Sequence, residues 1–197
     1  MVRLFHPNNM TGLKLDEPPR FVKDAIFQRS VWHEVTAKAD SYNDPGSFTA
    51  LIGYEWTPSQ IEGKDEGYGN FHRVVLFKDS AEKVDQILPF SRLDSQDPED
   101  LWDFLSDYEQ STGVEVIAIP HNGNATRGAM FALMDLNDRP LSKRYALLRS
   151  RWEPILEVTQ SKGDSETHPV LSPSDEFSDF ETWNGWYSDE RPGMELT

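Results

Sequence analysis

Histidines and strand-end carboxylates are the residues of this chain that could do chemistry, because the sequence contains five histidines and no cysteine. Without thiols a metal site must be built from His, Asp and Glu, and disulfides, iron–sulfur ligation and cysteine nucleophiles are excluded. Three candidates, Glu55, His121 and Glu157, come at or next to the end of predicted strands. Ligands gather at the carboxyl ends of strands in α/β folds, so this placement predicts a functional site.

Period-two alternation strengthens the case for two of these residues. His121 follows the apolar Ile117 and Ile119 on one strand face, Glu55 likewise comes last on its own face, and His72 lies early in a further strand. Each candidate also has an ordinary structural interpretation. A histidine can pair with a carbonyl group in the core, a strand-end glutamate can be solvated or paired with arginine, and Glu157 can form a simple ion pair.

Polar loops next to these strands supply candidates for substrate contacts. Residues 160–169 bring Lys, Asp, Glu and His together, including Lys162 and His168, and the loop after His121 contains Asn122 and Arg127. Arg127 and Lys162 are the cations in these loops, so each is a candidate for holding an anionic group of a substrate. Alternatively, both balance an acid-rich surface. His6 and His33 are interpreted as incidental.

The elements that must position these side chains alternate between helix and strand. The apolar patterns and the turn and cap residues predict helices over 21–42, from Asp97 to about 112 and over 141–152, and strands over 48–56, 71–77, 114–120 and 154–159. Asp97 followed by Pro98 is a strong helix start, since Asp caps and Pro suits the first helical position. The alternation favours an α/β fold with a mainly parallel sheet, although the first two strands could pair antiparallel.

Length, charge and hydropathy narrow the class of protein. A chain of 197 residues fits one domain, in which residues 1–19 and 184–197 have no periodicity and are expected to be irregular. The 19 Lys and Arg against 34 Asp and Glu give a net charge of −15, which argues against binding to nucleic acid or to an anionic membrane. The absence of a long apolar segment predicts a soluble protein, cytoplasmic or periplasmic. The sequence contains no phosphate-binding loop, dinucleotide fingerprint or nucleophile elbow.

Five motifs in order resemble a known superfamily. They are Asn43-Asp44-Pro45-Gly46 leading to Gly53-Tyr54-Glu55-Trp56-Thr57, then Phe71-His72-Arg73, Ser95-Gln96-Asp97-Pro98, Ile119-Pro120-His121-Asn122-Gly123-Asn124, and Glu157-Val158-Thr159-Gln160 with Lys162-Gly163 and Ser165-Glu166-Thr167-His168-Pro169. Over about residues 20–180 the chain resembles the large bacterial family of unknown function within the PHP (polymerase and histidinol phosphatase) superfamily.

The resemblance implies a fold and a metal centre. Proteins of that superfamily form a distorted (β/α) barrel of parallel strands, hold two or three divalent ions of Zn, Mn or Fe type, and commonly hydrolyse phosphate esters. By resemblance, Glu55 bridges two metals and His72 and His121 are metal ligands, with Glu55 and His121 at the catalytic centre. Glu157 is expected behind the ligands or beside the substrate, with Asn122, Arg127, Lys162 and His168.

The superfamily's opening His-x-His pair and closing Asp-x-His pair do not occur in this sequence. The predicted fold is therefore a partial barrel that lacks the first and last strands, a single incomplete domain over residues 1–197. Three functions remain open: a metal-dependent hydrolase of phosphate or related anionic esters, a catalytically inactive truncated domain, and a non-enzymatic acidic binding module. The metal's identity, the substrate and the oligomeric state are not predicted.

Overall fold

The computed structural model describes residues 20–58, 71–126, 128–161, 163–165, 169 and 172–180. Their elements follow in the order η2 (Arg20–Lys23), α1 (Ala25–Tyr42), β1 (Ile52–Trp56), β2 (Arg73–Phe77), α2 (Ala81–Val84), α3 (Pro98–Thr112), β3 (Val116–Pro120), η3 (Gly123–Ala125), η4 (Ala129–Phe131), α4 (Lys143–Trp152), β4 (Thr159–Gln160) and β5 (Gly163–Asp164).

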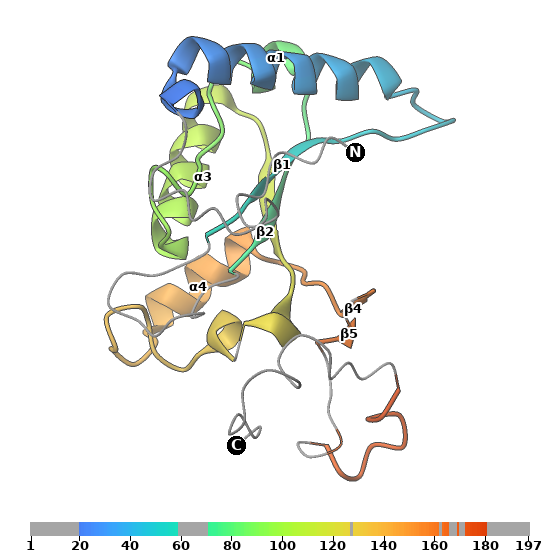
Figure 1. Ribbon diagram of the computed structural model, residues 1–197, viewed down its shortest axis with the longest axis vertical. Coiled ribbons are helices and arrows are strands. Elements are labelled where there is room, and N and C mark those ends of the chain that lie inside the picture. Colours follow the sequence, from blue (N-terminus) through green and yellow to red (C-terminus); the bar gives the residue numbers. More distant parts are fainter. Residues whose placement is uncertain are drawn as a thin grey trace.

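The centre of the described fold is a three-stranded antiparallel sheet in the order β1-β2-β3 (Figure 1). One end of the sheet is the row Trp56, Arg73 and Pro120, and the other end is the row formed by Ile52, Phe77 and Val116. Strand β2 therefore runs opposite to both of its neighbours. Because successive strands reverse, the carboxyl ends of β1 and β3 lie beside the start of β2. All three lie at the edge of the sheet formed by the row Trp56, Arg73 and Pro120.

The predicted parallel (β/α) barrel is wrong, and the path between β2 and β3 explains why. A single helix that runs back along a sheet gives parallel strands. In this chain residues 78–97 first run back along the sheet, and α3 then returns, so that Lys78 at the end of β2 donates its backbone N–H to the carbonyl of Glu115 at 3.0 Å. The chain re-enters the sheet beside the point where it left, and β3 must run antiparallel to β2.

Local signals explain where the helices begin and end. Asp97 caps α3 by accepting a hydrogen bond from the N–H of Glu99 at 2.8 Å, and Gly113 ends the helix at φ +70°, a conformation that favours glycine. Asp24 caps α1 in the same way, by accepting from Ile26 and Phe27. The three predicted helices are therefore confirmed, with boundaries shifted by a few residues.

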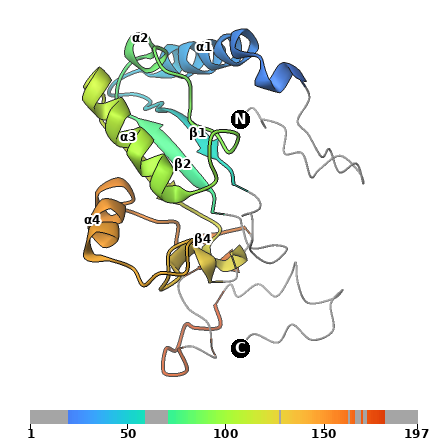
Figure 2. The ribbon, with the colours of Figure 1, turned by 90° about the vertical axis from the view of Figure 1, so that its left-hand side faces the viewer.

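Helices α1, α3 and α4 lie against one face of the sheet, as Figure 2 shows for the helical layer. Every second side chain of each strand points to that face and is buried against the side chains on the inner sides of the helices. The buried apolar residues include Trp32, Ile52, Trp56, Val75, Phe77, Leu101, Trp102, Leu105, Tyr108, Val116, Ala118 and Trp152. The opposite sheet face carries Glu55 and half-buried residues such as Val74 and Ile119, and α1, α3 and α4 do not lie on it.

The strand predicted over 154–159 is wrong for most of its length. In this segment the structure has strand geometry at Thr159 alone, which with Gln160 forms β4 and pairs with β5 in a separate two-stranded ribbon. Pro154 removes a backbone donor, and Leu156 and Val158 are roughly half exposed, so this segment has neither the ladder nor the buried face that a central strand needs.

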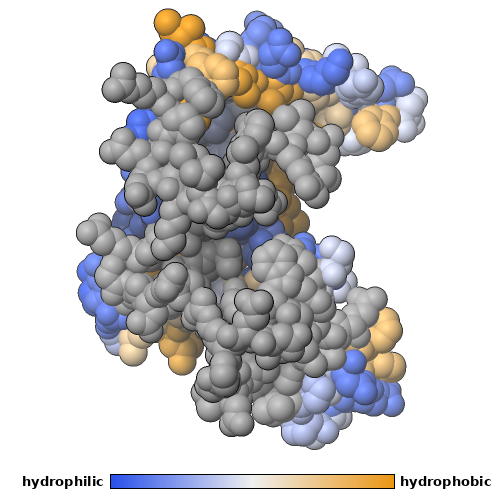
Figure 3. All heavy atoms as spheres, in the orientation of Figure 1, coloured by the Kyte–Doolittle hydropathy of each residue, from blue (hydrophilic) through white to orange (hydrophobic). Residues whose placement is uncertain are grey.

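The surface of the described elements is mostly polar, with local apolar patches (Figure 3). One such patch lies on α1, where Ile26 is 83% exposed. No helix in the described ranges is both long and apolar enough to cross a membrane.

Candidate metal centre

Three strand ends at one edge of the sheet bring Glu55, His72 and His121 together. Glu55 is the penultimate residue of β1, His72 immediately precedes β2, and His121 immediately follows β3. The backbone N–H of His121 donates to the carbonyl of His72 at 3.2 Å, which extends the β2–β3 ladder by one residue pair. Side chains alternate between faces, so all three project from the sheet face that the helices do not cover.

The three side chains offer ligand atoms that lie within 4.8 Å of one another. Oε1 of Glu55 is 2.9 Å from Nδ1 of His72 and 3.1 Å from Nε2 of His121, and the two imidazole rings meet edge to face at 5.6 Å between centroids. The predicted convergence of these residues is therefore confirmed. It occurs on an antiparallel sheet, however, and not at the rim of a parallel barrel. Their roles as ligands remain predictions.

The surroundings make Glu55 an anionic ligand candidate that solvent can reach. Its side chain is 49% exposed, whereas those of His72 and His121 are 8% and 15% exposed. Hydrogen bonds with His121 and His72 hold the pKa of the Glu55 carboxyl well below its ordinary value, and partial burial opposes them. A ligand or substrate would therefore approach from the Glu55 side, with the two imidazoles forming the inner wall.

Behind His72 lies a hydrogen-bonded group of polar side chains. Asn122 is buried, and its Nδ2 is 3.2 Å from Nδ1 of His72. Its backbone N–H donates to Oε2 of Glu157 at 3.0 Å, and Gln160 Nε2 donates to both Asn122 Oδ1 and Glu157 Oε2. The structure thus places Asn122 and Glu157 next to the candidate ligands. Glu157 accepts hydrogen bonds from amide groups, in contrast to the ordinary ion pair that was its alternative interpretation.

The two histidines differ in what holds their rings. The Asn122 amide contacts Nδ1 of His72, the nitrogen that also faces Glu55, whereas Nδ1 of His121, the nitrogen turned away from Glu55, is buried with no hydrogen-bond partner among the described residues. Histidines that bind metals usually have their second ring nitrogen fixed by a neighbouring group. Asn122 contacts the candidate ligand nitrogen of His72 itself, so it does not give His72 this kind of support.

Sequence reasoning missed two polar residues that support this edge of the sheet. Gln160 was part of a recognised motif without a role of its own, and no local pattern marked Glu153. Glu153 Oε1 accepts hydrogen bonds from Arg73 Nε and Trp102 Nε1, both at 2.9 Å, and Arg149 lies 3.0 Å from its second oxygen. This buried network fixes Arg73, the residue after His72.

The other predicted site residues are not brought to the centre by the described structure. Arg127, Lys162 and His168 lie outside the described residues, as does His6. His33 is largely exposed and contacts Asp85 at 2.7 Å on the far side of the helical layer, in keeping with an incidental histidine.

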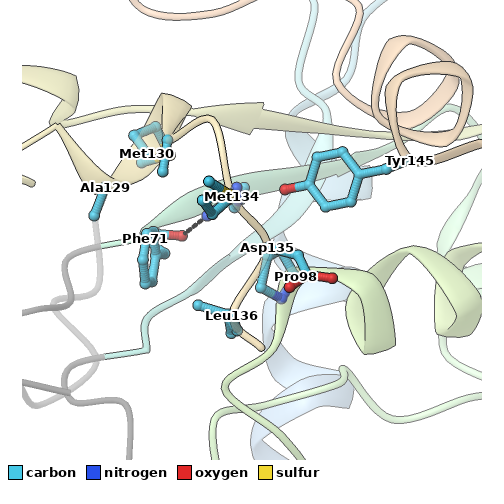
Figure 4. A pocket seen from close by; sticks show the side chains of 10 residues that line it. Phe71, Pro98, Ala129, Met130, Met134, Asp135, Leu136 and Tyr145 are labelled. Atoms are coloured by element: carbon cyan, nitrogen blue, oxygen red, sulfur yellow. Dashed lines mark hydrogen bonds between the residues drawn. The ribbon is translucent and has the colours of Figure 1, made fainter. Parts of the chain in front are cut away.

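A small cavity lies on the other face of the sheet and does not belong to this centre. Phe71, Met130, Met134 and Tyr145 are among its lining residues, and Arg73 donates to the carbonyl of Phe71 there (Figure 4). Its volume of about 20 Å³ accommodates about one water molecule. The sheet face that carries the half-exposed Glu55 is therefore the better candidate for a functional site.

Comparison with known proteins identifies the family of the chain but assigns no activity to it. No curated protein and no solved structure matches it. A family model described as "Protein of unknown function (DUF3604)" matches residues 6–194 and so covers the candidate centre. The chain belongs to this family, DUF3604.

Proposed function

We propose that this protein is a metal-dependent hydrolase of phosphate or related anionic esters, with Glu55, His72 and His121 as the metal ligands. One observation carries the proposal: these side chains, which come from three separate strand ends, offer ligand atoms within 4.8 Å of one another. The type of reaction, hydrolysis of anionic esters, is inferred from the resemblance of the motifs to the PHP superfamily. Membership of that superfamily is itself part of the proposal.

The donor set fits a divalent ion of Zn, Mn or Fe type. Two imidazoles and one carboxylate without thiolate suit these metals, and three protein ligands leave a coordination position for water. In a tetrahedral site with ~2.1 Å bonds, neighbouring ligand atoms lie about 3.4 Å apart. The present separations of 2.9 and 3.1 Å from Glu55 Oε1 are close to that value, so small side-chain rotations would admit an ion.

A bound divalent ion would lower the pKa of a bound water to about 7 and stabilise charge on the ester oxygens. The protein's own residues would supply the rest of the site. Glu55 gives the exposed anionic ligand, and His72 and His121 form its inner wall. We propose that Arg127 and Lys162 orient the anionic group of the substrate, since an acid-rich surface otherwise repels it.

Hydrolysis of p-nitrophenyl phosphate by metal-stripped protein reloaded with Zn²⁺, Mn²⁺ or Fe²⁺ tests the proposal. Glu55→Gln keeps the side-chain size and removes the anionic ligand, so it should lose the metal-dependent rate. Glu115→Gln changes an exposed glutamate that pairs with Lys78 at the other end of the sheet and should keep the rate. A Glu55→Gln rate equal to that of the wild type, or metal-loaded wild type that hydrolyses neither phosphate nor sulfate esters, contradicts the proposal.

A further inference from the structure

Glu157 bonds the chain on both sides of His121. Its backbone N–H donates to the carbonyl of Pro120 at 3.0 Å, and its carboxylate Oε2 accepts from the backbone N–H of Asn122, also at 3.0 Å. Successive residues of a strand direct their backbone groups to opposite edges, and His121 donates toward β2. Both bonds of Glu157 therefore lie on the outer edge of β3, and one residue holds the two neighbours of a candidate metal ligand.

These two bonds resemble the pairing of a neighbouring strand. In a parallel ladder one residue donates its N–H to the residue before its partner and accepts, with its own carbonyl, from the residue after. Glu157 makes the same two bonds around His121, but its side-chain carboxylate takes the place of the backbone carbonyl. Glu157 therefore supports the end of β3 from a segment that does not itself form a strand.

His121 depends on its backbone for the direction of its ring. Nδ1, the ring nitrogen turned away from Glu55, is buried with no hydrogen-bond partner among the described residues, although metal-binding histidines usually have that nitrogen held. The chain also leaves the strand directly after His121, since Asn122 has φ 63° and ψ 31°, a left-handed conformation. The buried N–H of Asn122 needs an acceptor outside the ladder, and the Glu157 carboxylate is that acceptor.

The carboxylate of Glu157 is itself held in this position. Gln160 Nε2 lies 2.5 Å from the same Oε2 and donates also to Oδ1 of Asn122 at 2.8 Å. Among the described residues, the cluster of possible ligand atoms consists of Glu55, His72 and His121 and does not include Glu157. Glu157 therefore reaches the centre through the backbone of its neighbours.

We infer that Glu157 is a positioning residue of the candidate metal centre: its two bonds hold the backbone before and after His121 and so keep this imidazole beside Glu55. The role rests on the proposed function, and it places Glu157 behind the ligands, not beside the substrate. It requires an oxygen acceptor at the end of a side chain of this length, and it does not require a negative charge.

Two conservative variants separate this role from that of a ligand or a charge. Glu157→Gln keeps the side-chain length and an oxygen that accepts from Asn122, so it should bind Zn²⁺ as tightly as the wild type. Glu157→Asp keeps the charge but is shorter by a methylene, so it should lose the bond. The expected loss of affinity is about 10- to 100-fold, the usual effect of removing a group that supports a metal ligand. Competition for Zn²⁺ with a chelator measures it.

Glu115→Asp is the matched control, because it makes the same change in an exposed glutamate that pairs with Lys78 at the other end of the sheet. It should leave the Zn²⁺ affinity unchanged. Hydrogen exchange of the metal-free protein gives a second readout. The Asn122 amide should be protected in the wild type and in Glu157→Gln, and it should exchange faster in Glu157→Asp. Far-ultraviolet circular dichroism should show that all variants keep the fold.

The outcomes distinguish this inference from the proposed function. A Glu157→Gln variant that loses Zn²⁺ affinity, or a Glu157→Asp variant that keeps it, overturns the inference even where the wild type binds metal. An unprotected Asn122 amide in the wild type overturns it as well. Wild-type protein that binds no divalent ion overturns the proposed function, and with it any role of Glu157 toward a metal.

Discussion

Arg73 donates its Nε–H to Glu153 Oε1 at 2.9 Å, and both side chains are 1% exposed. The pair lies on the helix-covered face of the sheet, one residue along the chain from His72. The guanidinium of Arg73 is also close to the rings of Trp56 and Phe71. A buried charge pair at this position ties α4, through Glu153, to the edge of the sheet that carries the candidate ligands.

Removing one charge of this pair should strongly destabilise the fold. Glu153→Gln keeps the size of the side chain but leaves Arg73 buried without a counter-charge, and such changes typically cost about 3–5 kcal/mol of unfolding free energy. Urea denaturation followed by tryptophan fluorescence measures the loss. Lys78→Ala, which breaks an exposed pair with Glu115, should leave stability unchanged. Equal stability losses in the two variants would show that burial of the pair does not matter.

The alkaline limit of stability should depend on Tyr108. Burial, with a smaller contribution from the charge of Asp79, raises the pKa of Tyr108 to about 12 from an ordinary 10.0. Below pH 10 the contribution of the Tyr108 phenol to the stability of the fold is fully present. As the pH rises from 10 to 12 the phenol ionises in the unfolded chain but not in the folded one, so stability falls by at most about 3 kcal/mol.

Tyr108→Phe removes this ionisation and keeps the ring in place. At neutral pH the variant should lose about 1 kcal/mol, because the Tyr108 hydroxyl donates to the carbonyl of Val84 at 3.2 Å. Between pH 10 and 12 its stability should fall less steeply than that of the wild type. The stability of the variant should still fall somewhat with pH in this range, since burial also raises the pKa of Tyr54. Parallel pH profiles for the two proteins would contradict the assignment.

A side chain at Gly53 should disturb the sheet edge that positions Glu55. A Cβ there would lie 2.6 Å from the carbonyl oxygen of Val75 and 2.7 Å from a methyl of Leu76, so β1 and β2 would have to separate. Gly53→Ala should cost at least about 2 kcal/mol and also weaken metal binding.

Gly113→Ala is the matched control, because its Cβ would meet nothing within 4 Å and its cost of about 1–2 kcal/mol would come from the positive φ alone. It ends α3 at a distance from the centre and should leave metal affinity unchanged. A Gly53→Ala protein with normal stability and affinity would show that the close approach of β1 to β2 is not needed.

The helices and the central strands were predictable because their signals are local. Asp97 with Pro98 marks the start of α3 wherever the helix later packs, and alternation along β1 and β3 does not depend on strand direction. The convergence of Glu55 and His121 was predictable for the same reason. Glu55 is the penultimate residue of β1 and His121 follows β3, and the ends of these two strands meet at one edge in this sheet as they would in a parallel one.

What could not be predicted depends on contacts between distant segments. Strand direction is set by residues 78–97 running back along the sheet, and their sequence has no periodicity that reveals this path. The segment from Pro154 has an apolar, β-branched composition, yet no strand pairs with it before Thr159. Glu153 and Gln160 contact partners that lie 80 and 38 residues away along the chain, so the sequence around each of them does not reveal these contacts.

Calorimetric titration of chelator-treated protein with Zn²⁺ and with Mn²⁺ tests the central claim most directly. We expect saturable binding of at least one ion per chain, and we expect Glu55→Gln and His121→Ala to lose it while both variants keep the fold. His33→Ala removes a histidine that contacts Asp85 and should bind as the wild type does. Wild-type protein that binds no divalent ion, or full binding in both Glu55→Gln and His121→Ala, would contradict the assignment of this centre.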